Sequence, residues 1–248
     1  RRRLPELEIP EPLAKLGRGL LEAGQRALYG GIFDVKTSGK SFIPQNRNFM
    51  VIANHTSHLD MGLIKVVLGS QGERLVALGA RDYFFDTPLK RAYFENFTNV
   101  IPMDRKGSLR ESLRLAGEAL NQGYNLLLFP EGTRSPDGAL QEFYPTLGFL
   151  ALGHKVDILP LYLHGAHDVL PKGSYWPKGK SLEVRIGPVL PVDLLKQRTA
   201  GLSRSESYRV ATRIAEEAIK SLRDGKVYSP SSLLVPTDTP REKKRGDA

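Results

Sequence analysis

The feature that most constrains the fold is a regular alternation of strand-like runs with helical patterns. Strand-like runs, rich in apolar residues, lie at 32–37, 49–53, 74–78, 100–102, 125–129, 158–163 and 182–186. Apolar residues at helical spacing lie at 60–68, 88–95, 108–122, 145–154 and 205–223. This alternation is typical of a parallel sheet covered by helices. We therefore predict an α/β fold with a mainly parallel, mixed sheet, in a chain long enough to bury a core.

The two ends of the chain differ from this alternating core. An amphipathic helix with basic residues is predicted near the start, and it either packs on the domain or lies in a membrane interface. We divide the chain into a linker at 1–12, a folded domain at 13–224 (helix at 13–29, central core at 30–190, last helix at 205–223) and a disordered tail or linker at 225–248. We recognise no signal peptide and no initiator Met, and we expect a mature chain or one domain of a longer polypeptide.

The composition limits the class of partner. A net charge of +9 indicates an anionic partner, either nucleic acid or a phospholipid surface. The chain has no RNP-type aromatic motif, zinc finger or basic helix-turn-helix pattern, which argues against nucleic acid. Alternatively, the positive charge has no specific partner and only keeps the protein soluble. No apolar stretch approaches about 18 residues, so no membrane-spanning helix is predicted. The absence of Cys excludes thiol nucleophiles and Cys-based zinc sites.

A first polar cluster, Asn54-His55-Thr56-Ser57-His58-Leu59-Asp60, follows the strand-like run 49–53 directly. A neutral imidazole can take the proton of an attacking hydroxyl, and a carboxylate on its other nitrogen holds the required tautomer. His55 and Asp60 can form this pair only if a turn separates them, because side chains five apart in a regular helix diverge. Alternatively the pair is structural, or His58 is the base. Asn54 is expected to tie the turn together through its amide.

The chain shows no nucleophile of its own beside this pair. A Gly-x-Ser-x-Gly elbow is absent from the sequence. The nucleophile would then be the alcohol of the substrate, which attacks an activated acyl group directly.

A second polar cluster, Phe129-Pro130-Glu131-Gly132-Thr133-Arg134-Ser135, follows the strand-like run 125–129. Gly132 permits close backbone approach, Thr133 supplies a hydroxyl, and Arg134 can grip a phosphate with two nitrogens. Glu131 could accept from a substrate hydroxyl, orient Arg134 or simply occupy a turn. Ligands bind at the carboxyl ends of strands in open α/β sheets, so both clusters should face one crevice. Without Gly-Lys-Ser/Thr this is no nucleotide P-loop.

Two further segments complete the pattern. Arg105 follows the strand-like run 100–102 and could be a second phosphate clamp. The segment 158–162 is apolar and favours a core position. The spacing of His154, His164 and His167 does not suggest a metal site.

In this order and spacing, the segments 54–60, 100–105, 129–135 and 158–161 resemble the four blocks of the glycerolipid acyltransferase family, whose familiar members are the 1-acyl-glycerol-3-phosphate acyltransferases. The resemblance covers residues 30–190. It implies that His55 is the general base on a glycerol hydroxyl and that Asp60 orients it. It also implies contacts to the acceptor, chiefly to its phosphate, from Arg105, Glu131, Gly132 and Arg134, with Thr133 nearby.

The resemblance further implies an activity and its partners. The enzyme would move a fatty acyl group from acyl-CoA or acyl-ACP to 1-acyl-glycerol-3-phosphate, giving phosphatidic acid without a metal or other cofactor. Alternatives are acylation of glycerol-3-phosphate or another lysophospholipid, thioesterase-like hydrolysis, or a catalytically idle membrane-binding module. The expected partners are a membrane surface with anionic lipid and other domains of a longer polypeptide, but no nucleic acid. The expected location is the cytoplasmic face of a membrane, with peripheral or monotopic attachment.

Overall fold

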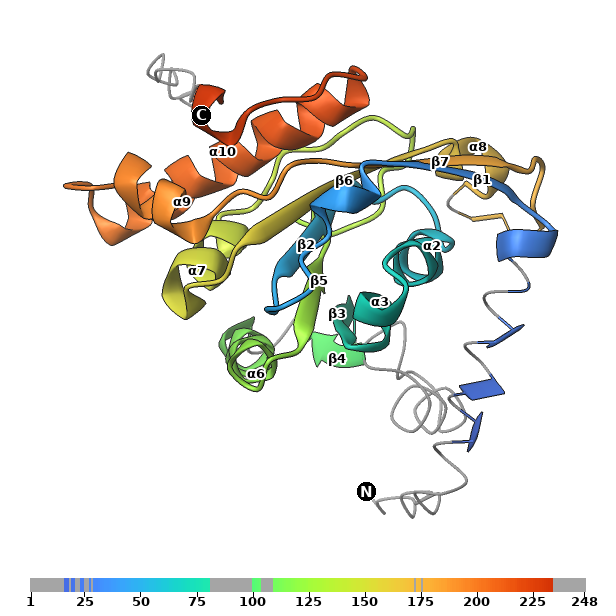
Figure 1. The fold of residues 1–248 in the computed structure, drawn as a ribbon, viewed down its shortest axis with the longest axis horizontal. Coiled ribbons are helices and arrows are strands. Elements are labelled where there is room, and N and C mark those ends of the chain that lie inside the picture. Colours follow the sequence, from blue (N-terminus) through green and yellow to red (C-terminus); the bar gives the residue numbers. More distant parts are fainter. Residues whose placement is uncertain are drawn as a thin grey trace, which may run out of the picture.

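A computed structural model describes residues 29–80, 100–103, 109–171 and 176–233, with shorter pieces at 16–17, 19–20, 23–24, 27 and 173–174. These residues form a sheet with helices on both faces (Figure 1). The strands are β1 (Asp34–Ser38), β2 (Met50–Ala53), β3 (Leu75–Ala80), β4 (Val100–Met103), β5 (Asn125–Leu128), β6 (Ile158–His164) and β7 (Ser181–Ile186). The α-helices are α2 (Asp60–Val67), α3 (Ser70–Glu73), α6 (Leu109–Asn121), α7 (Thr146–His154), α8 (Ala166–Val169), α9 (Val192–Arg198) and α10 (Arg204–Arg223). Two 3-10 turns are η1 (Lys40–Phe42) and η2 (Pro230–Ser232).

The strand order in the sheet is β1-β7-β6-β2-β5-β3-β4. Strand β7 runs antiparallel to β6, and the other neighbouring pairs are parallel. The predicted mainly parallel, mixed sheet is therefore confirmed. Strand β2 lies between β5 and β6, with Ile52 opposite Leu128 and Ala53 opposite Leu161. This register places the carboxyl ends of β2 and β5 side by side, and both polar clusters begin there.

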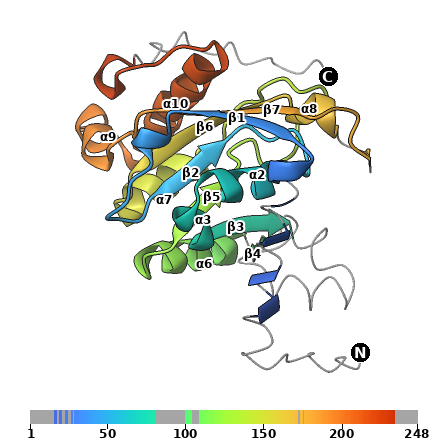
Figure 2. The same ribbon diagram turned by 45° about the vertical axis from the view of Figure 1, so that its right-hand side comes forward.

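Alternate residues of the central strands point into two separate cores. On one face, Val51 and Ala53 pack with α2. On the other face, Met50 and Ile52 pack with α6, α7, α9 and α10. Figure 2 shows α2 and α3 on the opposite side of the sheet from α10. Because strands in a parallel sheet are buried on both faces, β2 is apolar throughout, and this is why its sequence was recognisable as a strand.

Most long elements match the sequence prediction within a few residues. The short α3, α8 and α9 were not predicted, because four to seven residues give too little helical periodicity. The predicted helix at 88–95 and the predicted linker at 1–12 lie outside the described residues. Within the described residues, no helix combines the length and the apolar character needed to cross a bilayer.

The residues described between 16 and 27, and residues 29–31, are helical. Leu16 and Leu20 are 61% and 67% exposed, whereas Tyr29 is only 4% exposed. The Tyr29 hydroxyl donates a hydrogen bond of 2.8 Å to the carbonyl of Leu59, just before α2. Burial, with a further contribution from the charge of Asp60, raises the pKa of Tyr29. The end of this helical segment is thus anchored beside the start of α2.

The folded domain extends further toward the C-terminus than the boundary predicted at 225. Tyr228 and Leu233 are buried in the core under α10. The Tyr228 hydroxyl donates a hydrogen bond of 2.6 Å to the carbonyl of Pro188. Two apolar anchors among Ser and Pro residues are too sparse for a periodic pattern, so the sequence did not mark this segment as packed. Residues 234–248 lie outside the described part of the chain.

Candidate active site

The carboxylate of Asp60 organises the turn between β2 and α2. Its Oδ2 atom accepts three hydrogen bonds, from the His55 ring at 2.9 Å and from the backbone N–H groups of Thr56 and Ser57 at 2.7 and 2.9 Å. Asp60 is fully buried and begins α2, where the helix dipole favours a negative charge. The structure therefore brings His55 and Asp60 together in the strand-turn-helix arrangement that the sequence required.

The protonation of the His55 ring follows from this contact. The carboxylate faces Nδ1, which then carries the hydrogen, so that Nε2 keeps its lone pair and can accept a proton. The His55 side chain is 22% exposed, whereas that of Asp60 is 0% exposed. A partly exposed imidazole is thus backed by a carboxylate shielded from water, which is the arrangement that a general base requires.

The second cluster holds His55 from three further directions. The backbone N–H of His55 donates to Glu131 Oε1 at 2.8 Å, and its carbonyl accepts from the N–H of Ser135 at 2.8 Å. The imidazole also stacks on the ring of Phe129, with centroids 3.9 Å apart and an interplanar angle of 14°. Sequence reasoning counted Phe129 only as the end of a strand and missed this contact.

The buried Glu131 side chain hydrogen-bonds two separate backbone segments in this structure. Its side chain accepts from two backbone N–H groups, those of His55 at 2.8 Å and Gln141 at 2.9 Å, and the residue is only 3% exposed. Burial raises the pKa of Glu131 to about 7, against the effect of the two N–H donors, and the charge of Asp60 raises it further. Both Glu131 oxygens therefore bond within the protein, which the sequence could not reveal, and the contact of Glu131 with an acceptor stays a prediction.

The loop after Glu131 turns sharply at Gly132. Gly132 has φ of 71°, and its N–H donates to the carbonyl of Phe129 at 3.0 Å. A Cβ atom at this position would lie 3.0 Å from the ring of Tyr144. Glycine is therefore favoured both by the backbone angle and by the neighbouring ring. Thr133 is exposed and Arg134 is half-buried.

Arg134 lies within electrostatic range of His58. The pKa of His58 is lowered by partial burial and then by the positive charges of Arg134 and His55, while Asp60 opposes this shift. The charge of Arg134 thus acts on His58, which lies three residues after His55 in the same turn. The predicted residues His55, Asp60 and 131–134 thus share one site, whereas Arg105 lies outside the described residues.

The two serine hydroxyls next to the dyad are engaged in structural bonds. Ser57 is fully buried, and its Oγ donates to the carbonyl of Leu170 at 2.7 Å. Ser135 is also fully buried, and its Oγ donates to Asp137 at 2.9 Å. The Asn54 amide has a structural role, as predicted, but it joins the turn to β6 and not to itself: it accepts from the N–H of Leu163 at 2.7 Å and donates to the Leu163 carbonyl at 2.9 Å. The arrangement suits a base that activates an external hydroxyl rather than a serine of the enzyme.

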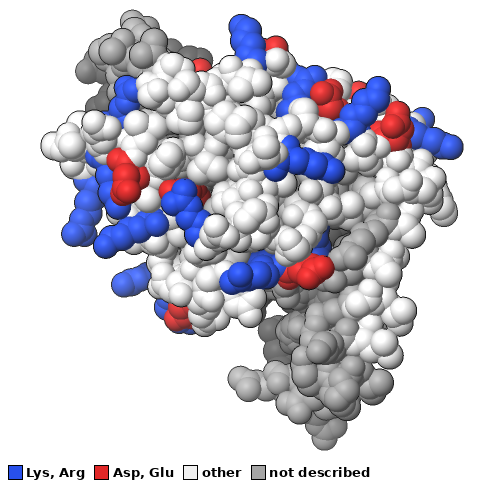
Figure 3. Space-filling view, viewed as in Figure 1, with Lys and Arg blue, Asp and Glu red and all other residues white. Residues whose placement is uncertain are grey.

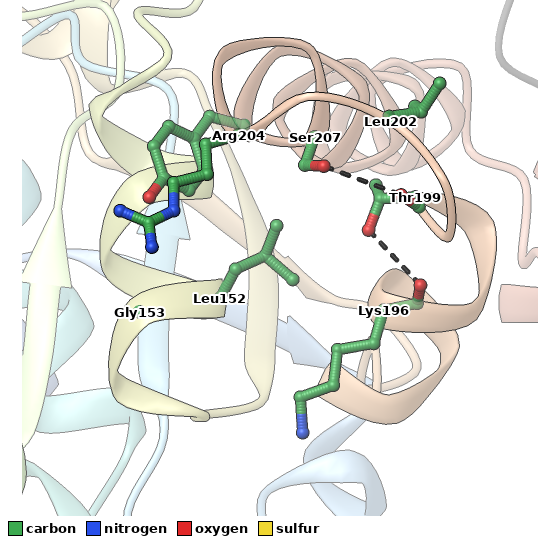
Figure 4. A pocket seen from close by; sticks show the side chains of 8 residues that line it. Leu152, Gly153, Lys196, Thr199, Leu202, Arg204 and Ser207 are labelled. Carbon is green, nitrogen blue, oxygen red and sulfur yellow. Dashed lines mark hydrogen bonds between the residues drawn. The ribbon is translucent and has the colours of Figure 1, made fainter.

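A cavity of about 270 Å³ lies elsewhere, between the end of α7 and the helices α9 and α10. Figure 4 shows Lys196 and Arg204 at its rim, with Leu152 between them. Helix α7 ends just before β6 begins, so this cavity belongs to the amino-end edge of the sheet. It is therefore at the opposite edge from His55.

Comparisons with known proteins agree with this geometry. The acyltransferase family model matches residues 34–164, more than half of the chain. The human 1-acyl-sn-glycerol-3-phosphate acyltransferase alpha is 26% identical over 201 residues, which cover 79% of this chain and 66% of that protein. The bovine protein of the same name is 28% identical over 173 residues, covering 68% of this chain and 58% of that protein. The chain therefore spans less than two thirds of the length of these relatives.

A solved structure shares the fold. The crystal structure of PlsC from Thermotoga maritima, titled a 1-acyl-sn-glycerophosphate (LPA) acyltransferase, superposes with a TM-score of 0.66 and 23% sequence identity. The match covers 88% of this chain and 84% of that one. Because the family model spans more than half of the chain and includes both polar clusters, the chain belongs to the acyltransferase family.

Proposed function

We propose that this protein transfers a fatty acyl group from a thioester donor to the hydroxyl of 1-acyl-glycerol-3-phosphate, giving phosphatidic acid. The observation that carries the proposal is the hydrogen bond of 2.9 Å between His55 and the buried Asp60, beside a loop with Arg134. The names of the human and bovine relatives support this acceptor. The engaged hydroxyls of Ser57 and Ser135 support direct transfer without an acyl-enzyme.

The proposed reaction needs one proton to move twice. Nε2 of His55 takes the proton of the acceptor hydroxyl while the hydroxyl oxygen attacks the thioester carbonyl carbon. The tetrahedral intermediate then collapses, the carbon–sulfur bond breaks, and the imidazolium returns the proton to the departing thiolate. The products are an ester and a thiol. Asp60 stabilises the imidazolium during this sequence because its carboxylate faces Nδ1.

The acceptor phosphate is assigned to the loop at 131–134. Arg134 can bind a phosphate through two nitrogens, and the turn at Gly132 keeps this part of the loop free of a Cβ atom. Arg105 is proposed as a second clamp, from its place in the sequence. Glu131 is proposed to act through His55, because its carboxylate bonds the His55 backbone.

The donor is proposed to be acyl-CoA or acyl-ACP, and the acceptor is taken from a membrane. Peripheral attachment is favoured by the exposed Leu16 and Leu20 on the N-terminal helical segment and by the net charge of +9. Figure 3 shows Lys and Arg spread over one face, with Asp and Glu beside several of them. Attachment to the cytoplasmic face follows in this proposal, because thioesters of coenzyme A and carrier protein are cytosolic molecules.

The test supplies purified protein with radiolabelled oleoyl-CoA and four acceptors in separate reactions: 1-acyl-glycerol-3-phosphate, glycerol-3-phosphate, a lysophosphatidylcholine and water alone. We expect label in phosphatidic acid, and none with His55→Ala as the matched control. Preferred acylation of another acceptor would refute the assigned acceptor. Release of free oleate at equal rates with and without acceptor would identify a hydrolase and refute the transfer.

A further inference from the structure

The loop between α8 and β7 displays the single Trp of the chain to solvent. Trp176 is 82% exposed. Tryptophan is a largely buried residue type in soluble proteins, and its amphipathic ring is enriched where proteins meet the membrane–water interface. An indole in water at a loop tip therefore indicates a surface that is covered by a partner.

The loop is held at both ends against the folded domain. The N–H of Lys178, near the end of the loop, donates to the carbonyl of Val169 at 2.8 Å and so closes the loop back onto the end of α8. At its end, the carbonyl of Lys180 accepts from the N–H of Asp34 at 2.8 Å, which joins the loop to β1. Trp176 is thus presented on a braced loop.

The same loop adjoins the catalytic turn. Leu170, where the loop begins, accepts the hydrogen bond of 2.7 Å from the hydroxyl of Ser57, between His55 and Asp60 in sequence. Helix α8 follows β6 directly and so lies at the carboxyl-end edge of the sheet. Figure 1 shows α8 and the start of β1 close together, on the opposite side of the molecule from α7 and α9. Trp176 therefore belongs to the edge that carries the dyad.

The charge of the loop matches an anionic surface. Residues 170–180 contain three Lys and no Asp or Glu. Lys178 and Lys180 are exposed, and Ile32, which is 49% exposed, lies two residues before the Asp34 that pairs with Lys180. Asp34 and Asp168 are exposed acidic neighbours on β1 and α8. The exposed apolar residues and the lysines combine the two features by which peripheral proteins bind anionic bilayers.

We propose that residues 176–180 of this loop form a docking site for an anionic lipid bilayer, with the Trp176 indole in the interface and Lys178 and Lys180 against lipid phosphates. The docking turns the edge of the sheet that carries His55 toward the membrane. This membrane contact is additional to the one proposed for Leu16 and Leu20. It rests on the proposed function only in taking a bilayer as the partner.

Because Trp176 is the single Trp, its fluorescence reports on this loop alone. The full chain is titrated with vesicles of phosphatidylcholine, and with vesicles in which half of the lipid is phosphatidylglycerol. We expect the emission to move to shorter wavelength, and lipids brominated on their acyl chains to quench it, with the anionic vesicles. Added salt should weaken this binding, because it screens exposed charges.

Charge-reversal variants separate the loop from general electrostatics. Lys178→Glu with Lys180→Glu should weaken vesicle binding by at least about tenfold, because each Lys or Arg near an anionic membrane surface adds to the free energy of binding. The matched control, Lys196→Glu with Arg204→Glu at the opposite edge, makes the same change in net charge and should weaken it less. Trp176→Ala should weaken binding about tenfold and leave activity on detergent-dispersed acceptor unchanged.

Several results would overturn the docking site. One is protein that sediments with anionic vesicles while the Trp176 emission stays unshifted and unquenched. Absence of binding to anionic vesicles, or an equal loss of vesicle affinity in the two charge-reversal variants, would also overturn it. So would a dimer whose Trp176 emission is shifted without lipid, because a second copy of the chain would then cover the loop. Normal vesicle insertion by a protein without acyl transfer would instead refute the proposed function and leave the docking site standing.

Discussion

Substitution of Asp60 by Asn distinguishes two roles for the carboxylate, holding the His55 tautomer and stabilising the imidazolium. All three hydrogen bonds that the structure gives this carboxylate end on Oδ2, and Oδ1 is buried without a hydrogen-bond partner among the described residues. The amide oxygen of Asn can take the place of Oδ2 and accept from the same three donors. The imidazole should therefore keep its hydrogen on Nδ1, while the negative charge is lost.

The magnitude follows from that loss of charge. A hydrogen bond to a charged group contributes about 1.5–3 kcal/mol, and a neutral one about 0.5–1.5 kcal/mol. The imidazolium forms only during the reaction, so the difference affects the transition state and lowers kcat about tenfold to a hundredfold. Removal of the base itself by His55→Ala should lower kcat by at least about a hundredfold, because general base catalysis contributes about 10²–10⁴-fold.

The assay is steady-state release of the thiol from oleoyl-CoA, with the acceptor varied. For Asp60→Asn we expect the reduced kcat with an unchanged KM for the acceptor. We also expect a lower unfolding midpoint in urea, because the amide Nδ2 takes the buried position of Oδ1, where no acceptor lies among the described residues. Asp60→Ala is the structural comparison, because it leaves the buried N–H groups of Thr56 and Ser57 without an acceptor, at about 1–3 kcal/mol each. A decrease of about 10⁴-fold in a folded Asp60→Asn enzyme would show that the tautomer is reversed and refute this reasoning. Wild-type kcat would refute the role of the charge.

Three further predictions concern the surroundings of the dyad. Arg134→Ala should raise the KM of a phosphorylated acceptor about tenfold to a hundredfold, with partial rescue by Arg134→Lys, and equal losses toward phosphate-free acceptors would contradict this. Burial raises the folded-state pKa of Glu131 to about 7, so the native state holds a proton that the unfolded state loses near pH 4.5, and the protein loses stability as the pH rises from about 4.5 to 7. Glu131→Gln should therefore make the urea-derived free energy of unfolding depend less on pH in this range. An unchanged pH dependence would show that Glu131 is not its cause. A Cβ at Gly62 would lie 2.6 Å from the Tyr29 hydroxyl, so Gly62→Ala should lower the free energy of unfolding by about 1–3 kcal/mol. In a double-mutant cycle, Tyr29→Phe should reduce this loss because it removes the clashing oxygen, whereas additive effects would place the strain elsewhere.

The sequence was sufficient for the sheet because its central strands are buried on both faces. Continuous apolar runs such as 50–53 and 126–128 mark such strands, and the polar residues that follow them mark the ends where ligands bind. The pairing of His55 with Asp60 could be predicted for the same reason. The strand ends before His55 and a helix begins at Asp60, so the chain must turn between them.

The roles of Glu131 and Phe129 depend on contacts that one-dimensional spacing does not contain. The Glu131 carboxylate meets the N–H of Gln141 because the loop returns along itself ten residues later, and it meets His55 because β2 and β5 are neighbours. A glutamate between Pro and Gly looks the same in sequence whether it binds a ligand or the backbone. The anchor at Tyr228 was missed for a related reason, because a single buried ring leaves no periodic pattern.

The contacts around His55 join the turn at 54–60 to the loop at 129–135. Its ring nitrogen is held by Asp60, its backbone N–H by Glu131, its carbonyl by Ser135 and its ring face by Phe129. Neither loop can therefore shift without moving the imidazole relative to Arg134. A fixed separation between a base and a phosphate-binding cation selects acceptors by the distance between their hydroxyl and their phosphate. In the proposed function, specificity for a glycerol phosphate thus comes from the bracing of His55 as well as from the charge of Arg134.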